Sequence, residues 1–364
     1  MTATRSQHLI RSHILELRRV EHGSVSAAEL APFGRTPADV LDFSVNINPL
    51  GPAPTVLHAI QETDWIRYPG DDEAPLRKGL ADRNGVTSDQ VALGNGSAEL
   101  LWLIALAILQ PQDHVVVVSP TFGEYARAAR TVGAEVREVQ TLRNLPPGRV
   151  LFVCNPNNPT GFVYCQAEIE QVLNEQPDRL VVVDEAYAAF APERWHSERL
   201  LAAHDNLVIL RSLTKEHALP GVRLGYLLAG PEVACAVESV RPPWSVNAGA
   251  LRAGLAALGT EAETHVERAR GIVATSRQVL TRGLNQLGYV VRPSAANFVL
   301  VEVGDAAKFR SALLPHGFIV RDCMSFGLPS HVRVASRLPD ECEALLDMVR
   351  RLKDGGHLPA HGTI

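Results

Sequence analysis

Cysteines are few in this sequence, and their positions suit neither a disulfide framework nor a metal site. There are five, an odd number, and no two of them form a Cys-x-x-Cys pair: Cys154, Cys165, Cys235, Cys323 and Cys342. Disulfide-rich secreted domains carry cysteines in even numbers, and zinc sites carry them in close pairs. We therefore expect reduced thiols, no metal ion and a cytoplasmic protein.

Long apolar runs and an excess of basic residues are absent as well. No stretch reaches the roughly 20 apolar residues that a membrane-spanning helix needs, and residues 1–24 lack the apolar core of a secretory signal. The formal net charge is −5, so we expect neither a membrane nor a nucleic-acid partner. The N-terminal segment predicts one short amphipathic helix, with Leu9, Ile10, Ile14 and Leu17 at helical spacing. A regulator with a DNA-binding helix-turn-helix is an alternative, which this single helix disfavours.

Apolar residues make up 46% of the 364-residue chain, which is ample for the cores of about two domains. Strand-like apolar runs alternate with helical patterns between VALGN, near residue 91, and LVILRS, near residue 207. This alternation predicts an α/β fold with a mostly parallel, doubly wound sheet. We expect an N-terminal helix and arm over residues 1–48, a large domain over 49–245, and a small α+β domain over 246–364 that opens with a long helix.

A lysine follows the last parallel strand of this series. Lys215 lies in RSLTKEHALPGVRLGY, behind the hydroxyls of Ser212 and Thr214 and ahead of Arg223. An ammonium group is costly to bury, but burial lowers the pKa of a lysine and suits its amine to a Schiff base with an aldehyde cofactor. The hydroxyls and the arginine would then hold a phosphate. A surface lysine followed by turn residues is the alternative interpretation.

Polar groups also follow three earlier strands. VVVDEAYAAF ends in Asp184 and Tyr187, and a carboxylate there can pair with a protonated ring nitrogen and make the ring an electron sink. LFVCNPNNPTG places Asn158 at the exit of another strand. VALGNGSAELL puts Ser97 and Ala98 at the first amides of a helix, which form a ready anion site. Ordinary turns can match each motif alone, whereas all four motifs in this order are a strong signal of a binding site at the strand ends.

Together these motifs resemble the fold-type I pyridoxal-phosphate enzymes of the class I/II aminotransferase family, over nearly the whole chain. The resemblance implies pyridoxal 5′-phosphate bound to Lys215, with Asp184 at the pyridine nitrogen. It also implies further contacts to the cofactor: Asn158 and Tyr187 at the ring hydroxyl, Phe122 stacked on the ring, and Ser97, Ala98, Ser212, Thr214 and Arg223 at the phosphate.

Tyr68, in the segment RYPG, bears on the oligomeric state. In the family that the chain resembles, a tyrosine at this position reaches the cofactor phosphate of the neighbouring subunit. The resemblance therefore implies a homodimer with shared active sites. Taken alone, Tyr-Pro is only the start of a loop.

Arginines near the C-terminus are the candidates for binding a substrate anion. Arg321, Arg333 and Arg337 lie in RDCMSFGLPSHVRVASR. By resemblance, an arginine at position 333 clamps a carboxylate or a phosphate, for which the planar guanidinium is suited. A solvated arginine at a strand edge is the alternative. Asn46, in DFSVNINPLGP, and His22 complete the predicted substrate contacts.

The residues that hold the cofactor do not choose between transamination and decarboxylation. Within the family, the chain resembles the branch of histidinol-phosphate aminotransferases and of the threonine-phosphate decarboxylases of cobalamin biosynthesis. DFSVNINPLGP and RDCMSFGL lean toward the decarboxylases, but Ser24 departs from their His-Gly-Gly. Transamination needs only Lys215 to move a proton. We therefore expect an aminotransferase for a phosphorylated amino substrate, with histidinol phosphate first and the 2-oxoglutarate/glutamate pair as partner. Threonine-phosphate decarboxylation is the alternative.

Overall fold

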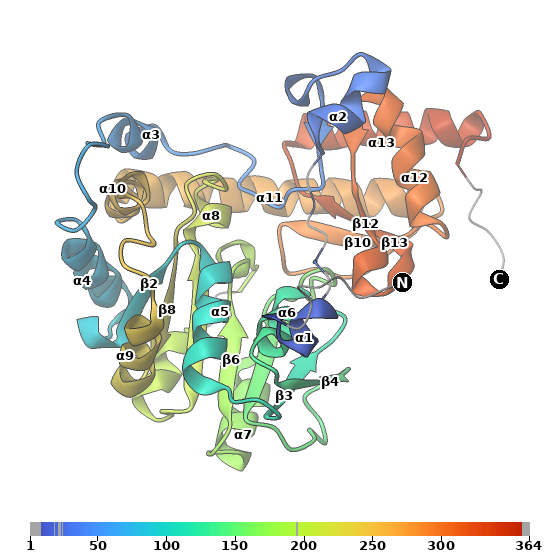
Figure 1. The fold of residues 1–364 in the computed structure, drawn as a ribbon. Helices are drawn as coiled ribbons and strands as arrows, with labels where there is room; N and C mark the ends of the chain where they lie inside the picture. Colours follow the sequence, from blue (N-terminus) through green and yellow to red (C-terminus); the bar gives the residue numbers. More distant parts are fainter. Residues whose placement is uncertain (1–8, 18, 21–22, 24, 194–195, 359–364) are drawn as a thin grey trace.

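The computed structural model describes residues 9–17, 19–20, 23, 25–193 and 196–358. This part of the chain forms a larger and a smaller body, and the long helix α11, Thr260–Gln286, runs across both (Figure 1). Helices cover both faces of the sheet in the larger body, as the alternating pattern of the sequence predicted.

A seven-stranded sheet lies at the centre of the larger body, in the order β2-β8-β7-β6-β5-β3-β4. β8 is antiparallel to both of its neighbours, and the other strand pairs are parallel. The prediction of a mostly parallel sheet is therefore confirmed. The strands are β2 Val91–Gly94, β3 His114–Val118, β4 Glu135–Val139, β5 Val150–Cys154, β6 Leu180–Asp184, β7 Leu207–Ser212 and β8 Gly225–Ala229.

Two apolar cores bury the faces of this sheet, which explains why its strands, except the edge strand β4, are rich in apolar residues. Because side chains alternate along a strand, Val181 and Val183 of β6 enter one core and Val182 enters the other. Helices of the first core are α3 Pro54–Gln61, α4 Glu73–Asn84, α7 Gln166–Glu175 and α10 Ala248–Ala257. Helices of the second are α5 Ser97–Ile108, α6 Glu124–Thr131 and α9 Pro231–Val240.

The core of the larger body extends beyond residue 245, where we expected the small domain to begin. Ala250, Leu251 and Ala253 of α10 are buried in the first core, together with Ala262 of α11. The chain therefore leaves this core within α11. The predicted long helix consists of two helices, with a break between Ala257 and Thr260.

The smaller body has a four-stranded antiparallel sheet in the order β12-β13-β10-β9. Its core also contains Phe43, because β1, Leu41–Asp42, pairs with β11 and draws the N-terminal arm onto this body. Helices α11, α12 and α13 pack on the sheet and contribute to the same core, together with β10 and β13. The elements are β9 Val290–Val291, β10 Phe298–Glu302, α12 Ala306–Leu313, β11 Phe318–Ile319, β12 Arg321–Cys323, β13 Leu328–Ala335 and α13 Pro339–Asp354.

The N-terminal helix is shorter than predicted. α1 spans Ser12–Leu15, a single turn, and the exposed Leu9 and Ile10 precede it. A contact between His13 Nε2 and the carbonyl oxygen of Thr131, 3.2 Å apart, joins α1 to α6. A second short helix, α2 Ala27–Leu30, lies against the smaller body (Figure 1). Among the helices that the structure describes, none has the length and apolar character to cross a membrane.

Candidate active site

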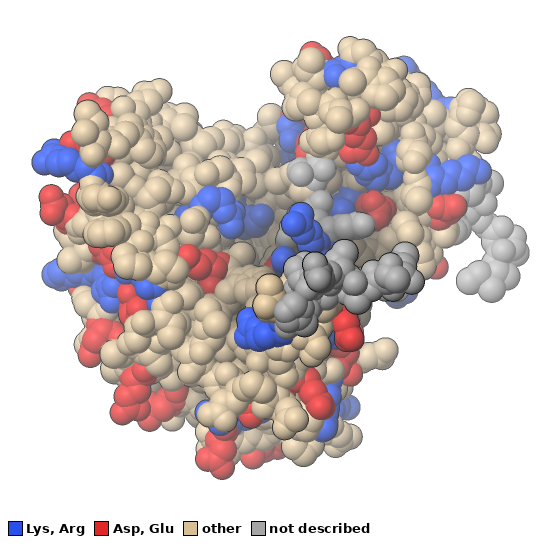
Figure 2. All heavy atoms as spheres, viewed as in Figure 1, with Lys and Arg blue, Asp and Glu red and all other residues tan. Residues whose placement is uncertain are grey.

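A cavity of about 520 Å³ lies between the two bodies, at the carboxyl ends of β5, β6 and β7. Open α/β sheets bind ligands at this edge. Figure 2 shows the molecule hollowed between the bodies, with Lys and Arg side chains around the hollow. The cavity brings together most of the predicted site residues: Asn46, Ser97, Ala98, Phe122, Asn158, Asp184, Tyr187, Ser212, Thr214, Lys215, Arg223, Arg321 and Arg333.

Lys215 reaches this cavity from α8, Leu213–Glu216, the short helix that follows β7 directly. Burial lowers the pKa of its amine to about 8, and the positive charges of Arg333 and Arg223 act in the same direction. The negative charge of Asp184 opposes them. A substantial fraction of the amine is therefore neutral near pH 7–8 and able to act as a nucleophile or a base.

Asp184 ends β6 and is 4% exposed. Its Oδ2 accepts a hydrogen bond from the Tyr125 hydroxyl at 2.8 Å, and its Oδ1 accepts one from the amide of Ala186 at 3.0 Å. Burial raises the pKa of this carboxyl, while the two hydrogen bonds and the charge of Lys215 favour the ionised form. The carboxylate is thus held in one orientation at the sheet edge, as a partner for a cationic ring nitrogen.

Sequence reasoning missed Tyr125, which lies in α6 and stacks on Phe152 with ring centroids 5.3 Å apart. Its hydroxyl fixes one oxygen of Asp184. Helical spacing gave no signal for Tyr125, because the predicted ring-stacking Phe122 precedes α6, which begins at Glu124. The two rings meet edge to face, 5.6 Å apart.

The N-terminus of α5 and the loop after α8 form an anion cradle. Gly96 has φ +78°, and a Cβ there would lie 2.5 Å from Arg223 Nη2, so a side chain at position 96 would displace the guanidinium. The Oγ of Ser212 and the Oγ1 of Thr214 are 2.6 Å apart. Helix amides, two hydroxyls and a guanidinium are the donors that a phosphate monoester requires. This donor set fits the phosphate of pyridoxal 5′-phosphate.

Two arginines from the smaller body line the same cavity. Arg321 of β12 and Arg333 of β13 are directly paired across antiparallel strands. Like charges in this position repel, and burial together with Arg321 lowers the pKa of Arg333. Arg333 donates to the carbonyl oxygen of Ser44 at 2.7 Å and to Asn158 Oδ1, while its buried Nε has no hydrogen-bond partner among the described residues. An anion bound between the two guanidinium groups would relieve this repulsion.

Three predicted residues are not placed in this cavity. Tyr68 is 78% exposed and stacks on Trp244, with ring centroids 4.4 Å apart. Arg337 bonds to both carboxylate oxygens of Glu341, at 3.0 and 2.9 Å, and does not line the cavity. His22 lies outside the described residues. Conversely, Ser325 was missed by sequence reasoning, and its Oγ accepts a hydrogen bond from Arg321 at 2.7 Å.

Comparisons with known proteins agree with this geometry. The family model "Aminotransferase class I and II" matches residues 38–349. A histidinol-phosphate aminotransferase of Symbiobacterium thermophilum is 38% identical over 327 residues, which are 86% of this chain and 90% of that protein.

Two solved structures are also similar. One is L-threonine-O-3-phosphate decarboxylase from Porphyromonas gingivalis, with a TM-score of 0.79, 27% identity, and coverage of 86% of this chain and 100% of that one. The other is histidinol-phosphate aminotransferase from Sinorhizobium meliloti in complex with pyridoxal-5′-phosphate, with a TM-score of 0.82, 24% identity, and coverage of 94% and 98%. The predicted family and cofactor are confirmed: this chain belongs to the class I and II aminotransferase family and is a pyridoxal-phosphate-dependent aminotransferase.

Proposed function

We propose that this enzyme transfers the amino group of histidinol phosphate, with 2-oxoglutarate and glutamate as the partner pair. The observation that carries the proposal is the pair formed by Arg321 and Arg333 inside the cofactor cavity. Two guanidinium groups in one cavity suit a dianionic phosphate, because a guanidinium can bind such an anion through two parallel hydrogen bonds. A relative at 38% identity, named histidinol-phosphate aminotransferase, supports the same substrate.

The chemistry divides between the cofactor and the side chains around it. When bound, pyridoxal phosphate supplies an electron sink for the substrate carbon that bears the amino group. Lys215, whose amine pKa of about 8 leaves it partly neutral, holds the cofactor and moves the proton at that carbon. Asp184 balances the positive charge of the ring nitrogen, and Tyr125 keeps the Asp184 carboxylate in place. Arg333 and Arg321 fix the anionic end of the substrate.

Removal of the substrate phosphate should cost most of the specificity. Without the anion, the two positive charges lose their counter-charge and the buried Nε of Arg333 keeps no partner among the described residues, so kcat/KM for histidinol should be at least about 100-fold below that for histidinol phosphate. Arg333→Lys should reduce this ratio, because an ammonium cannot reproduce the bidentate geometry. Arg337→Lys makes the same change outside the cavity and should leave the ratio as it is. Equal kcat/KM values for the two compounds would refute a phosphorylated substrate.

We also propose a homodimer with shared active sites. Tyr68 lies on the surface with other exposed apolar side chains nearby in the sequence, Trp65 and Ile66, and it stacks on the exposed Trp244. Exposed apolar clusters mark interaction sites. In such a dimer the hydroxyl of Tyr68 would reach the cofactor phosphate in the partner subunit.

Tyr68→Phe should therefore weaken cofactor binding about ten-fold or more, because one hydrogen bond to a charged group contributes roughly 1.5–3 kcal/mol. The dissociation constant of pyridoxal phosphate, measured by titration of the apoenzyme, checks this. Tyr164→Phe is the matched control, since Tyr164 packs in the core away from the cavity. Full activity of a monomer in dilute solution would contradict the shared site.

A further inference from the structure

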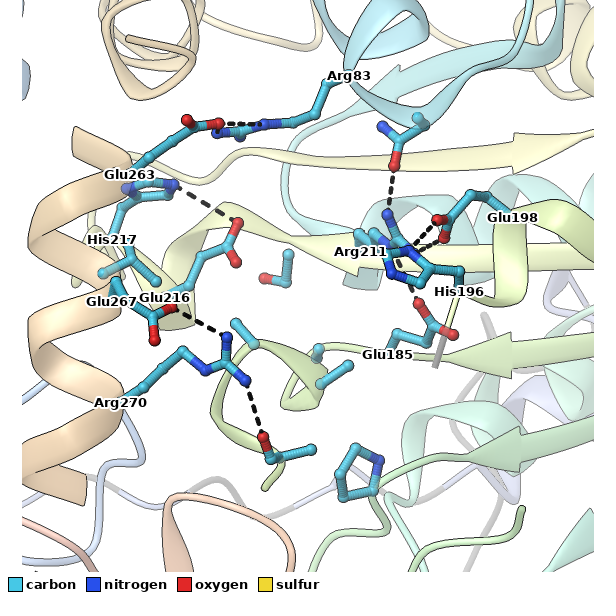
Figure 3. A pocket seen from close by; sticks show the side chains of 18 of the residues that line it. Arg83, Glu185, His196, Glu198, Arg211, Glu216, His217, Glu263, Glu267 and Arg270 are labelled. Carbon is cyan, nitrogen blue, oxygen red and sulfur yellow. Dashed lines mark hydrogen bonds and ion pairs between the residues drawn. The ribbon is translucent and has the colours of Figure 1, made fainter. Parts of the chain in front are cut away.

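A second cavity, also of about 520 Å³, adjoins the cofactor cavity, and many of the side chains that line it are charged (Figure 3). The wall between the two cavities is thin, because Ala186 and Ser212 line both. Each charged residue at this wall is the chain neighbour of a cofactor-site residue. Glu185 follows Asp184, Arg211 precedes Ser212, and Glu216 follows Lys215.

Arg211 connects the carboxylates of this second cavity. Its Nε donates to Glu185 Oε2 at 2.9 Å, its Nη2 donates to Glu198 Oε2 at 2.6 Å, and its Nη1 donates to Asn84 Oδ1. Burial acts to lower the pKa of Arg211, but Glu185 and Glu198 outweigh it and raise that pKa well above its usual value. Arg211 is therefore firmly cationic and compensates two carboxylates.

Other charged or titratable groups face this cavity from the surrounding elements, and they largely have partners of their own. Arg83 pairs with Glu263, Arg270 with Glu267, and Glu216 with His217. The rest of the set is His196, which contacts Glu198, together with Glu193 and with Tyr226 of β8. Among the described residues, Arg211 is the cation that contacts Glu185. On the other side of the wall, Asp184 faces Tyr125, Cys154 and Lys215.

We propose that Arg211 is a positioning residue for the cofactor site, which neutralises Glu185 so that the adjacent Asp184 stays ionised against the ring nitrogen. This inference rests on the proposed role of Asp184. Glu185 and Asp184 are consecutive and each is 4% exposed, so two negative charges share one buried strand end. Like charges in such a place disfavour each other's ionisation, and the charge of Glu185 does act to raise the pKa of Asp184.

The test follows the absorbance of the enzyme-bound cofactor as a function of pH, without substrate, in variants that change one charge at a time. Arg211→Met leaves the negative charge of Glu185 uncompensated. The pH at the midpoint of the absorbance change should therefore rise. Glu185→Gln removes the negative charge and should lower the midpoint. One unit charge about 10 Å away, at an effective dielectric constant of about 20, shifts a midpoint by about one pH unit. The double variant Arg211→Met/Glu185→Gln should return toward the wild-type midpoint and regain activity lost in Arg211→Met.

A purely structural role for Arg211 predicts a different pattern. The double variant would then be no more active than Arg211→Met. Both single variants would shift the pH midpoint of the cofactor absorbance in the same direction. Arg241→Met is a matched control, because Arg241 also bridges two glutamates, Glu73 and Glu238, away from the cofactor cavity. It should lower the melting temperature without shifting the midpoint.

An unchanged pH midpoint in Arg211→Met would overturn the proposal. It would mean that Glu185 becomes neutral by binding a proton, so that the charge of Arg211 is not needed to neutralise it. If Arg211→Met does not fold, Glu185→Gln decides alone: an unchanged midpoint there also overturns it. Near-normal activity of Asp184→Asn would instead remove the proposed role of Asp184. A strong loss in Asp184→Asn with no shift in the Arg211 and Glu185 variants would remove only this inference.

Discussion

Lys215→Ala should abolish turnover, with a loss in kcat beyond about 10⁴-fold. Proton transfer by a positioned side chain contributes about 10²–10⁴-fold by itself, and this lysine is also expected to hold the cofactor covalently. The lowered pKa of Lys215, about 8, marks it as the reactive amine of the cavity. No other lysine lines that cavity within the described part of the chain.

Borohydride reduction of the holoenzyme, followed by peptide mass mapping, checks the same assignment independently of activity. The pyridoxyl group should be found on Lys215. The sequence has three other lysines, Lys78, Lys308 and Lys353, and a label on any of them would reject Lys215 as the attachment point. Lys308→Ala, which changes an exposed residue of α12, is the control and should keep wild-type kcat.

Asp184→Asn should lower kcat by about 10²–10³-fold, the cost of removing one preorganised electrostatic partner from an active site. The asparagine keeps the shape and can still bond to Tyr125 and to the amide of Ala186, but it loses the charge that favours a protonated ring nitrogen. Cofactor binding should persist, because the cradle around Ser212 and Arg223 is untouched. Steady-state kinetics and a cofactor titration separate the two effects. A variant with near-normal kcat would show that the charge of Asp184 is not used.

The chemistry of the site could be predicted from the sequence where it depends on short motifs at strand ends. Asp184 ends β6 and Lys215 lies in the short helix after β7, and parallel strands bring their carboxyl ends to one edge of the sheet. The sheet itself was predictable because its inner strands are buried on both faces and alternate with helices.

Contacts made across the fold could not be predicted in this way. Tyr125 contacts Asp184 although 59 residues separate them, and Arg211 contacts Asn84 across 127. Arg337 shows a second limit. β13 ends at Ala335, so the alternation that directs Arg333 to the cavity does not extend to Arg337. Its guanidinium instead bonds to Glu341, one turn along in α13.

The most direct test of the central claim is an assay of the purified holoenzyme with histidinol phosphate and 2-oxoglutarate, run beside an assay with threonine phosphate. Glutamate and carbon dioxide are measured in both. The account predicts glutamate in amounts equal to the histidinol phosphate consumed, and no carbon dioxide from threonine phosphate. Release of carbon dioxide from threonine phosphate, without glutamate from histidinol phosphate, would contradict the proposed substrate and reaction.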